Sequence, residues 1–175
     1  MKTIALCAAL LITLSLQAQT IDSLDNIVLK IPAGWQINKQ SFYTQLTAYD
    51  SHHGFCQMVI NPQQPSTDKH ATFLKEWSDV VLASYQTTVK PNPQPKSTST
   101  GTVLSFGAEV TDRTSGAAFY VELNMFDCGT YVQSVMLTSG NQQHLQFFDA
   151  SWQLLITGVK KRGATQSALA SGNQQ

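Results

Sequence analysis

The sequence contains few charged residues. Asp, Glu, Lys and Arg make up 13% of the 175 residues, well below the usual quarter, and eleven basic residues are balanced by eleven acidic ones. This balance argues against a basic nucleic-acid-binding surface. The hydrophobic fraction of 42% argues against an acidic disordered chain. Gln, Thr, Ser and Asn, 59 residues together, replace the missing charges.

The motifs of the common enzyme classes are also missing. There is no glycine-rich phosphate-binding loop, no Gly-x-Ser-x-Gly elbow and no His-Glu-x-x-His segment. The only adjacent histidines are His52 and His53, in a predicted turn beside Asp50. Neighbouring side chains on an extended chain point to opposite sides, so this pair is a poor chelate, and a weak metal site with Asp50 is the less favoured alternative. We predict no catalytic residue, no metal and no cofactor.

The N-terminus has the order of a secretory signal peptide. Lys2 supplies a positive end, residues 4–16 form an almost continuous apolar run, and Ala18 offers a small residue for cleavage. A run of about thirteen residues is too short for a hydrocarbon core that needs roughly 20, which disfavours an uncleaved anchor. We expect a signal peptide over 1–18, export to the periplasm or the medium, and no transmembrane segment in the mature chain.

Export changes the interpretation of the cysteines. Cys7 is lost with the leader, and Cys56 and Cys128 remain. In an oxidising compartment this pair is a candidate disulfide, and two buried, reduced thiols are the alternative. A bond needs Cα atoms about 4.4–6.8 Å apart. Two of the strands predicted below, at 55–60 and 104–110, decide the outcome. If a helical crossover makes these strands parallel, both cysteines lie at one edge of the sheet. If the strands are antiparallel, the cysteines lie at opposite edges.

The pattern predicts one domain over 27–162, preceded by a loose polar lead-in over 19–26 and followed by a disordered tail over 163–175. The first half of the domain is predicted to contain three short strands. These lie at 27–31, 42–49 and 55–60, and the last two are expected to form a hairpin.

A strong helix is predicted next. Ser66 or Thr67 can cap its free amides, and Asp68 complements the positive end of the helix. The helix should end before Pro91, since the residue before a proline is pushed out of the α region. Charged residues such as Glu76 are assigned to its other faces. Its predicted stripe at helical spacing consists of Phe73, Trp77, Val80, Val81 and Ser84.

The second half begins with a proline-rich linker over 91–100, which is expected to be extended. Three strands joined by short turns are predicted around 104–110, 119–125 and 131–137. A closing helix is predicted from an apolar stripe of Leu145, Phe148, Trp152, Leu155 and Ile156. The order β-β-β-α-β-β-β-α predicts an α+β fold, a single-domain α/β/α sandwich with a mostly antiparallel six-stranded sheet flanked by helices.

Two segments resemble a known superfamily. Ile31-Pro32-Ala33-Gly34-Trp35, after a short strand, is similar to the opening of the PsbP-like and Mog-type superfamily. Phe147-Phe148-Asp149-Ala150-Ser151-Trp152 resembles the Phe-x-x-x-x-x-Ser ending of bacterial exported members of the DcrB type. The resemblance implies an antiparallel sheet flanked by helices and a role in binding or assembly, and it assigns no functional residue.

These features favour an exported, non-catalytic binding or assembly module over an enzyme. Its partner is expected to be an envelope or extracellular protein, not a nucleic acid. Trp35, Tyr43 and Tyr49 lie near the first strand and the hairpin, and not all of them can be core residues. A partly exposed aromatic cluster would suit contact with protein or glycan, and single surface aromatics are the alternative.

An exported hydrolase or thiol enzyme is the competing hypothesis. Its site would be assembled from four turn residues, Asp50, His52, Cys128 and His144. Asp127 beside Cys128 would raise the pKa of the thiol, which is opposite to what activation requires. Glu109 and Glu122, on adjacent predicted strands, are a further candidate carboxylate pair, although solvent-facing positions are favoured for both.

Overall fold

The computed structural model describes residues 20–31, 34–49, 54–146, 148 and 156–160. The predicted signal peptide over 1–18 and the predicted tail over 163–175 lie outside them.

Strands dominate the described part of the chain, which contains few helices. The strands are β1 (Thr20–Leu24), β2 (Ile27–Ile31), β3 (Gln36–Lys39), β4 (Thr44–Tyr49), β5 (Phe55–Ile60), β6 (Gln64–Pro65), β7 (Tyr85–Gln86), β8 (Gln94–Thr98), β9 (Gly101–Asp112), β10 (Ala118–Asp127), β11 (Tyr131–Ser139) and β12 (Ile156–Val159). The main helical segment consists of α1 (Lys69–Glu76), a π-helical turn (Trp77–Val81) and α2 (Leu82–Ser84). A short helix spans 142–146.

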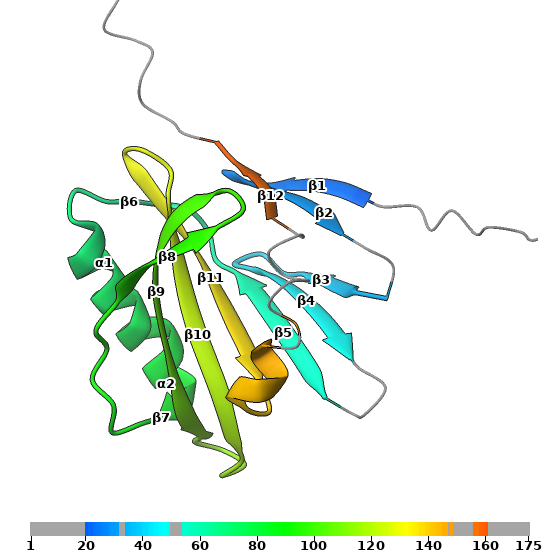
Figure 1. Ribbon diagram of the computed structural model, residues 1–175, viewed down its shortest axis with the longest axis vertical. Helices are drawn as coiled ribbons and strands as arrows, with labels where there is room; N and C mark the ends of the chain where they lie inside the picture. The colour runs from blue at the N-terminus through cyan, green and yellow to red at the C-terminus, as the bar shows by residue number, and fades with distance from the viewer. Residues whose placement is uncertain (1–19, 32–33, 50–53, 147, 149–155, 161–175) are drawn as a thin grey trace, which may run out of the picture.

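One large antiparallel sheet forms the centre of the fold (Figure 1). Its order is β3-β4-β5-β11-β10-β9-β7, with β6 paired to β11 and β8 paired to β9. The predicted hairpin is β4–β5, and the predicted meander is β9–β10–β11. Asp112 fixes the turn after β9 by accepting hydrogen bonds from the N–H groups of Thr114 and Ser115, and Gly116 supplies a φ of +70° there. The mostly antiparallel α+β prediction is confirmed.

The sheet is wider than the six strands predicted. Residues 36–39 add β3 at one edge, and residues 94–98 of the expected linker pair with the start of β9 as β8. Pro95 is compatible with a strand here, because among the described residues β8 pairs on one side only and a proline at an edge need not donate. The proline-rich composition correctly predicted an extended segment but did not indicate that part of it pairs with β9 as a strand.

The main helical segment covers one face of the sheet. It begins at Asp68, whose side chain accepts a hydrogen bond from the N–H of Ala71 at 3.0 Å, so Asp68 is the cap in place of Ser66 or Thr67. The buried side chains of Phe73, Trp77 and Val81 pack against β9, β10 and β11. No helix within the described ranges is long and apolar enough to cross a membrane.

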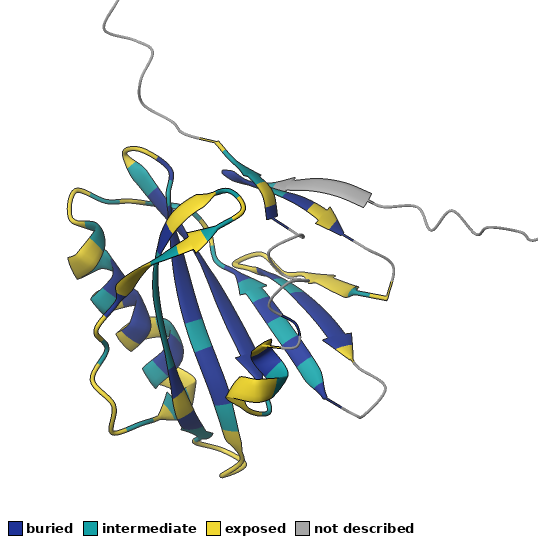
Figure 2. Cartoon of the chain, viewed as in Figure 1, coloured by how far each residue is buried: buried dark blue, intermediate teal, exposed yellow. Residues whose placement is uncertain are grey.

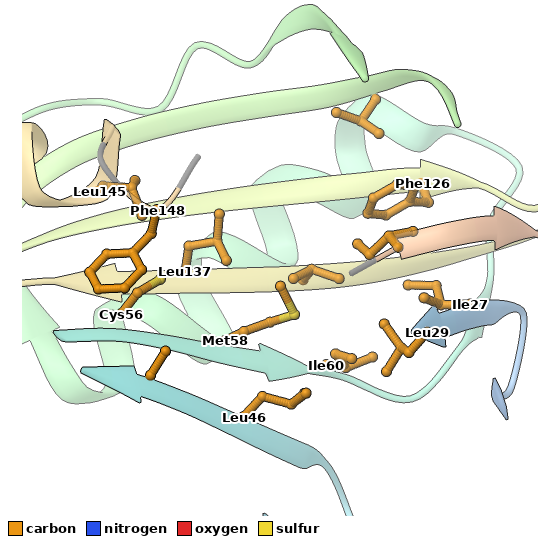
Figure 3. Packing of buried hydrophobic residues seen from close by; sticks show 14 of the residues in the cluster. Ile27, Leu29, Leu46, Cys56, Met58, Ile60, Phe126, Leu137, Leu145 and Phe148 are labelled. Atoms are coloured by element: carbon orange, nitrogen blue, oxygen red, sulfur yellow. The ribbon is translucent and has the colours of Figure 1, made fainter. Parts of the chain in front are cut away.

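The opposite face of the sheet is covered by a second, three-stranded sheet in the order β1-β2-β12 (Figure 1). Ile27 and Leu29 of β2 point from this sheet into a core that also contains Leu46, Met58 and Leu137 of the main sheet (Figure 3). Leu145 and Phe148, after β11, cover another part of the same core. Figure 2 shows the resulting band of buried residues along the central strands.

Two predicted segments differ from the structure. The lead-in is not loose, because Thr20–Leu24 pairs with β2 along its whole length. Within the described residues the closing helix covers 142–146 and Phe148, and Ile156 belongs to β12, which pairs with β2 on the other side. Pairing with β2 outweighs the helical spacing of the apolar residues. Trp152 and Leu155 of the predicted stripe lie outside the described residues.

Cys56 and Cys128 are both buried thiols, as in the alternative that the sequence left open, and no disulfide joins them. Cys56 pairs with Ser139 at the end of β11. The N–H of Cys128 instead donates to the backbone oxygen of Tyr131 at the start of β11. At ~3.4 Å per residue, the length of β11 separates the two cysteines by about 27 Å, far beyond the reach of a disulfide. The reason is topological. β5 and β10 flank β11 and run parallel to each other. The start of β5, with Cys56, and the end of β10, before Cys128, therefore lie at opposite edges of the sheet.

Candidate binding sites

The edge of the main sheet at β3 and β4 exposes large apolar side chains. Phe42, Tyr49, Ile37 and Tyr43 are 78%, 65%, 41% and 39% exposed. β3 ends the sheet, and among the described residues it pairs only with β4. Of the three aromatics near the hairpin, not all of which were expected in the core, Tyr43 and Tyr49 are therefore exposed. Trp35 instead packs, partly buried, against the core between the two sheets.

Cys128 and His144 of the predicted thiol site do not come together. Cys128 is fully buried before β11, and His144 lies beyond the far end of the same strand. Asp50, His52 and His53 lie outside the described residues. Within the described ranges no group of three or more His, Cys, Asp or Glu side chains could hold a metal ion.

Glu109 and Glu122 lie on one face of the sheet but do not oppose each other. Glu109 is paired with Tyr120, and Glu122 with Gly107. Burial and then the charges of these two carboxylates raise the pKa of Tyr120. The Glu122 carboxylate instead accepts hydrogen bonds from the Lys96 ammonium at 2.8 Å and from the Asn124 amide at 2.9 Å.

A buried carboxyl group that the sequence analysis assigned to another helix face lies under the main helical segment. Glu76, the last residue of α1, is 6% exposed. The Asn61 amide donates to its Oε1 at 3.1 Å, the Gln64 amide donates to its Oε2 at 2.7 Å, and the Ser134 hydroxyl donates to Oε1. Burial raises the pKa of Glu76, and these three hydrogen bonds oppose the increase.

Glu76 lines an open cavity of about 290 Å³. The cavity lies between the main helical segment and the loop after β5, and the π-helical turn begins directly after Glu76. Single π turns are rare and occur often at functional sites. The lining residues are Asn61, Pro62, Gln63, Gln64, Lys75, Glu76, Asp79 and Val80. A buried acid in a cavity next to a π turn is the clearest site-like feature of the described chain, and we call it the Glu76 cavity.

Hydrogen bonds connect the Glu76 cavity to the second sheet. The backbone oxygen of Asn61 accepts from the Gln133 amide at 3.0 Å, and Gln133 Oε1 accepts from the N–H of Asn26 at 3.0 Å. The Asn26 amide also donates to Gln63 at 2.6 Å. Gln133 and Asn26 therefore both fix the loop at 61–63, which forms one wall of the cavity. This favours a cavity that is formed before a ligand binds.

The sequence did contain a signal for this site. Positions 73, 76, 77, 80 and 81 all fall on one helical stripe at the spacing i, i+3, i+4, i+7 and i+8. Glu76 occupies one of these positions, although the sequence analysis places it on another face of the helix. An acid within an apolar stripe indicates a buried carboxyl that needs hydrogen-bond donors.

The described structure belongs to the class of α+β proteins built on a large antiparallel sheet. No family model and no curated protein matches the sequence. Among solved structures, the chain is similar to LpqN, a protein involved in cell envelope biogenesis of Mycobacterium tuberculosis. The two share 11% sequence identity, with a TM-score of 0.41, and the match covers 82% of this chain and 84% of that one.

Proposed function

We propose that this chain is an exported, non-catalytic module that binds or helps assemble an envelope or extracellular protein. The leader-like N-terminus supports export, and the resemblance to the PsbP-like and Mog-type superfamily supports a binding fold. The observation that carries the proposal is the exposed edge formed by Ile37, Phe42, Tyr43 and Tyr49 beside the outer strand β3. Large apolar side chains exposed along the edge of a sheet suit contact with a partner, and aromatic residues are enriched at interaction surfaces.

Site-specific photocrosslinking tests this proposal. A photoreactive amino acid at Phe42 should give a discrete crosslinked product in cells that make the protein. The matched control is the same probe at Val89, which is 50% exposed in the connection between β7 and β8. Equal products from both positions, or none from Phe42, would contradict the proposed interface. Mass analysis of the purified protein tests export, which requires loss of residues 1–18.

An exported hydrolase is the second candidate, and the Glu76 cavity is the observation that favours it. A carboxyl with a raised pKa suits a general acid, and Asp79 lies three residues further along the helical segment. All three hydrogen bonds to Glu76, however, come from neutral side chains that already hold its oxygens. Turnover of a glycoside or ester substrate that disappears in Glu76→Gln would support the hydrolase.

A further inference from the structure

We propose that the Glu76 cavity is a binding site for an arginine side chain of a protein partner. The inference rests on the proposed binding function and specifies its chemistry at a place separate from the exposed β3–β4 edge. Three observations carry it. One acceptor position on the carboxylate is not occupied by a described residue, no described cation forms an ion pair with Glu76, and the walls are neutral and partly apolar at Pro62, Gln63, Gln64 and Val80.

The carboxylate of Glu76 has one acceptor position that no described residue occupies. An ionised carboxylate offers about four such positions, two on each oxygen. Oε1 accepts from both Asn61 and Ser134, whereas Oε2 accepts only from Gln64. The remaining position on Oε2 can take an N–H donor from a bound group.

Within the described ranges, no cationic side chain forms an ion pair with Glu76. Lys75 also lines the cavity, but its ammonium pairs with Asp79, and its side chain is 73% exposed. Asn61, Gln64 and Ser134 are neutral. A buried charge is costly unless it is paired, so a cation that enters the cavity would provide the missing countercharge.

The walls favour guanidinium over ammonium. Pro62 and Val80 give the cavity apolar surface, and Gln63 and Gln64 give it neutral amide groups. Guanidinium is planar and more weakly hydrated than ammonium, so its transfer into a partly apolar cavity costs less. A volume of about 290 Å³ also leaves room for the end of a long side chain.

Titration with small probes tests the assignment. The purified protein is titrated with N-acetyl-arginine amide, and the side-chain amide signals of Asn61 and Gln64 are followed by NMR. The neutral citrulline analogue is the matched probe, and N-acetyl-lysine amide tests the choice of cation. We expect arginine to shift these signals and citrulline to leave them unchanged, with lysine binding more weakly than arginine.

Two variants make the test specific. Glu76→Gln should weaken arginine binding about ten- to hundredfold, because hydrogen bonds to charged groups contribute more than neutral ones. Glu109→Gln removes an exposed acid from another part of the sheet and should leave binding unchanged. Spectra that otherwise match the wild type would show that Glu76→Gln is folded.

Absence of arginine binding, equal binding of citrulline, or unchanged binding to Glu76→Gln would overturn the proposal. Equal binding of lysine would overturn the choice of guanidinium. Crosslinking at Phe42 does not involve Glu76. A positive crosslink without arginine binding would therefore refute this inference and leave the proposed function standing. Arginine binding without the crosslink would instead contradict the interface at the β3–β4 edge.

Discussion

Replacing Glu76 by Gln removes the charge of the buried carboxylate and keeps its size and one acceptor oxygen. Burial raises the pKa of Glu76 in the folded state above its value in the unfolded chain. Folding therefore favours the protonated form. The associated stability is fully present below the unfolded pKa, near 4.3, and is lost as the pH rises through the folded pKa. We expect Glu76→Gln to gain stability relative to the wild type between pH 4 and pH 8.

The comparison variant is Glu76→Leu, which removes both oxygens. It leaves the donors of Asn61, Gln64 and Ser134 without this acceptor. At a lower limit of ~1 kcal/mol for each donor, the donors left without this acceptor cost about 3 kcal/mol. The loss relative to the wild type is largest at low pH, where the wild type keeps the stability of its protonated carboxyl. At pH 8, Glu76→Gln should lose much less than this, because the Gln oxygen still accepts and the Ser134 hydroxyl can turn to accept from the new amide.

Urea denaturation followed by tryptophan fluorescence measures both variants, with buried Trp77 beside the substitution as a reporter. The slope against urea should be unchanged, so that midpoints compare directly. A loss of about 3 kcal/mol for Glu76→Gln at pH 8, equal to that of Glu76→Leu, would refute the reasoning. It would mean that the charge is compensated within the protein, and the arginine proposal would lose its basis.

Three further predictions follow from other contacts. Gly107→Ala would place a Cβ 2.2 Å from the Tyr120 hydroxyl, so the Tyr120 ring must move. We expect the unfolding free energy, measured by urea titration, to fall by about 1–3 kcal/mol. An unchanged midpoint would contradict this packing. Burial, and then the charge of Glu122, raise the pKa of the Cys56 thiol to about 12. Cys56 and the buried Cys128 should therefore resist alkylation at pH 8 in the folded protein and react fully in urea, as measured by mass spectrometry; rapid labelling of either residue before unfolding would argue against its placement. Asp68→Ala removes the cap of α1 and should cost about 1 kcal/mol, whereas Asp68→Asn should cost less; equal losses from both would indicate that the negative charge, not the cap, stabilises the helix.

The sequence predicted the elements whose patterns are local. The alternation over 119–125 and the short turns on either side were sufficient for the meander, and the apolar stripe containing Phe73 and Trp77 was sufficient for the main helix. Most predicted core positions of these segments are buried in the structure, whereas Val80 and Phe119 are only partly buried against the core. Such patterns report which side of an element faces the core, and each can be recognised without knowing the neighbours.

Elements defined by distant partners were missed. β12 contains Ile156 and Gly158 at spacings that also fit a helix or a loop, and only β2, far away in sequence, makes it a strand. The same partner orders β1 from a polar stretch. The Glu76 cavity was missed for a related reason, because its donors Asn61, Gln64 and Ser134 come from two other segments. Secondary-structure propensity carries no information about contacts between segments that are far apart in the sequence.

The position of β2 between β1 and β12 has a consequence for the timing of folding. The strand near the beginning of the chain obtains its second neighbour only when residues 156–159 are available. Until then, one side of β2 has no partner strand, and the cover that this small sheet provides over the inner core is incomplete. The small sheet can therefore be completed only late in synthesis, after the strands of the main sheet have been made.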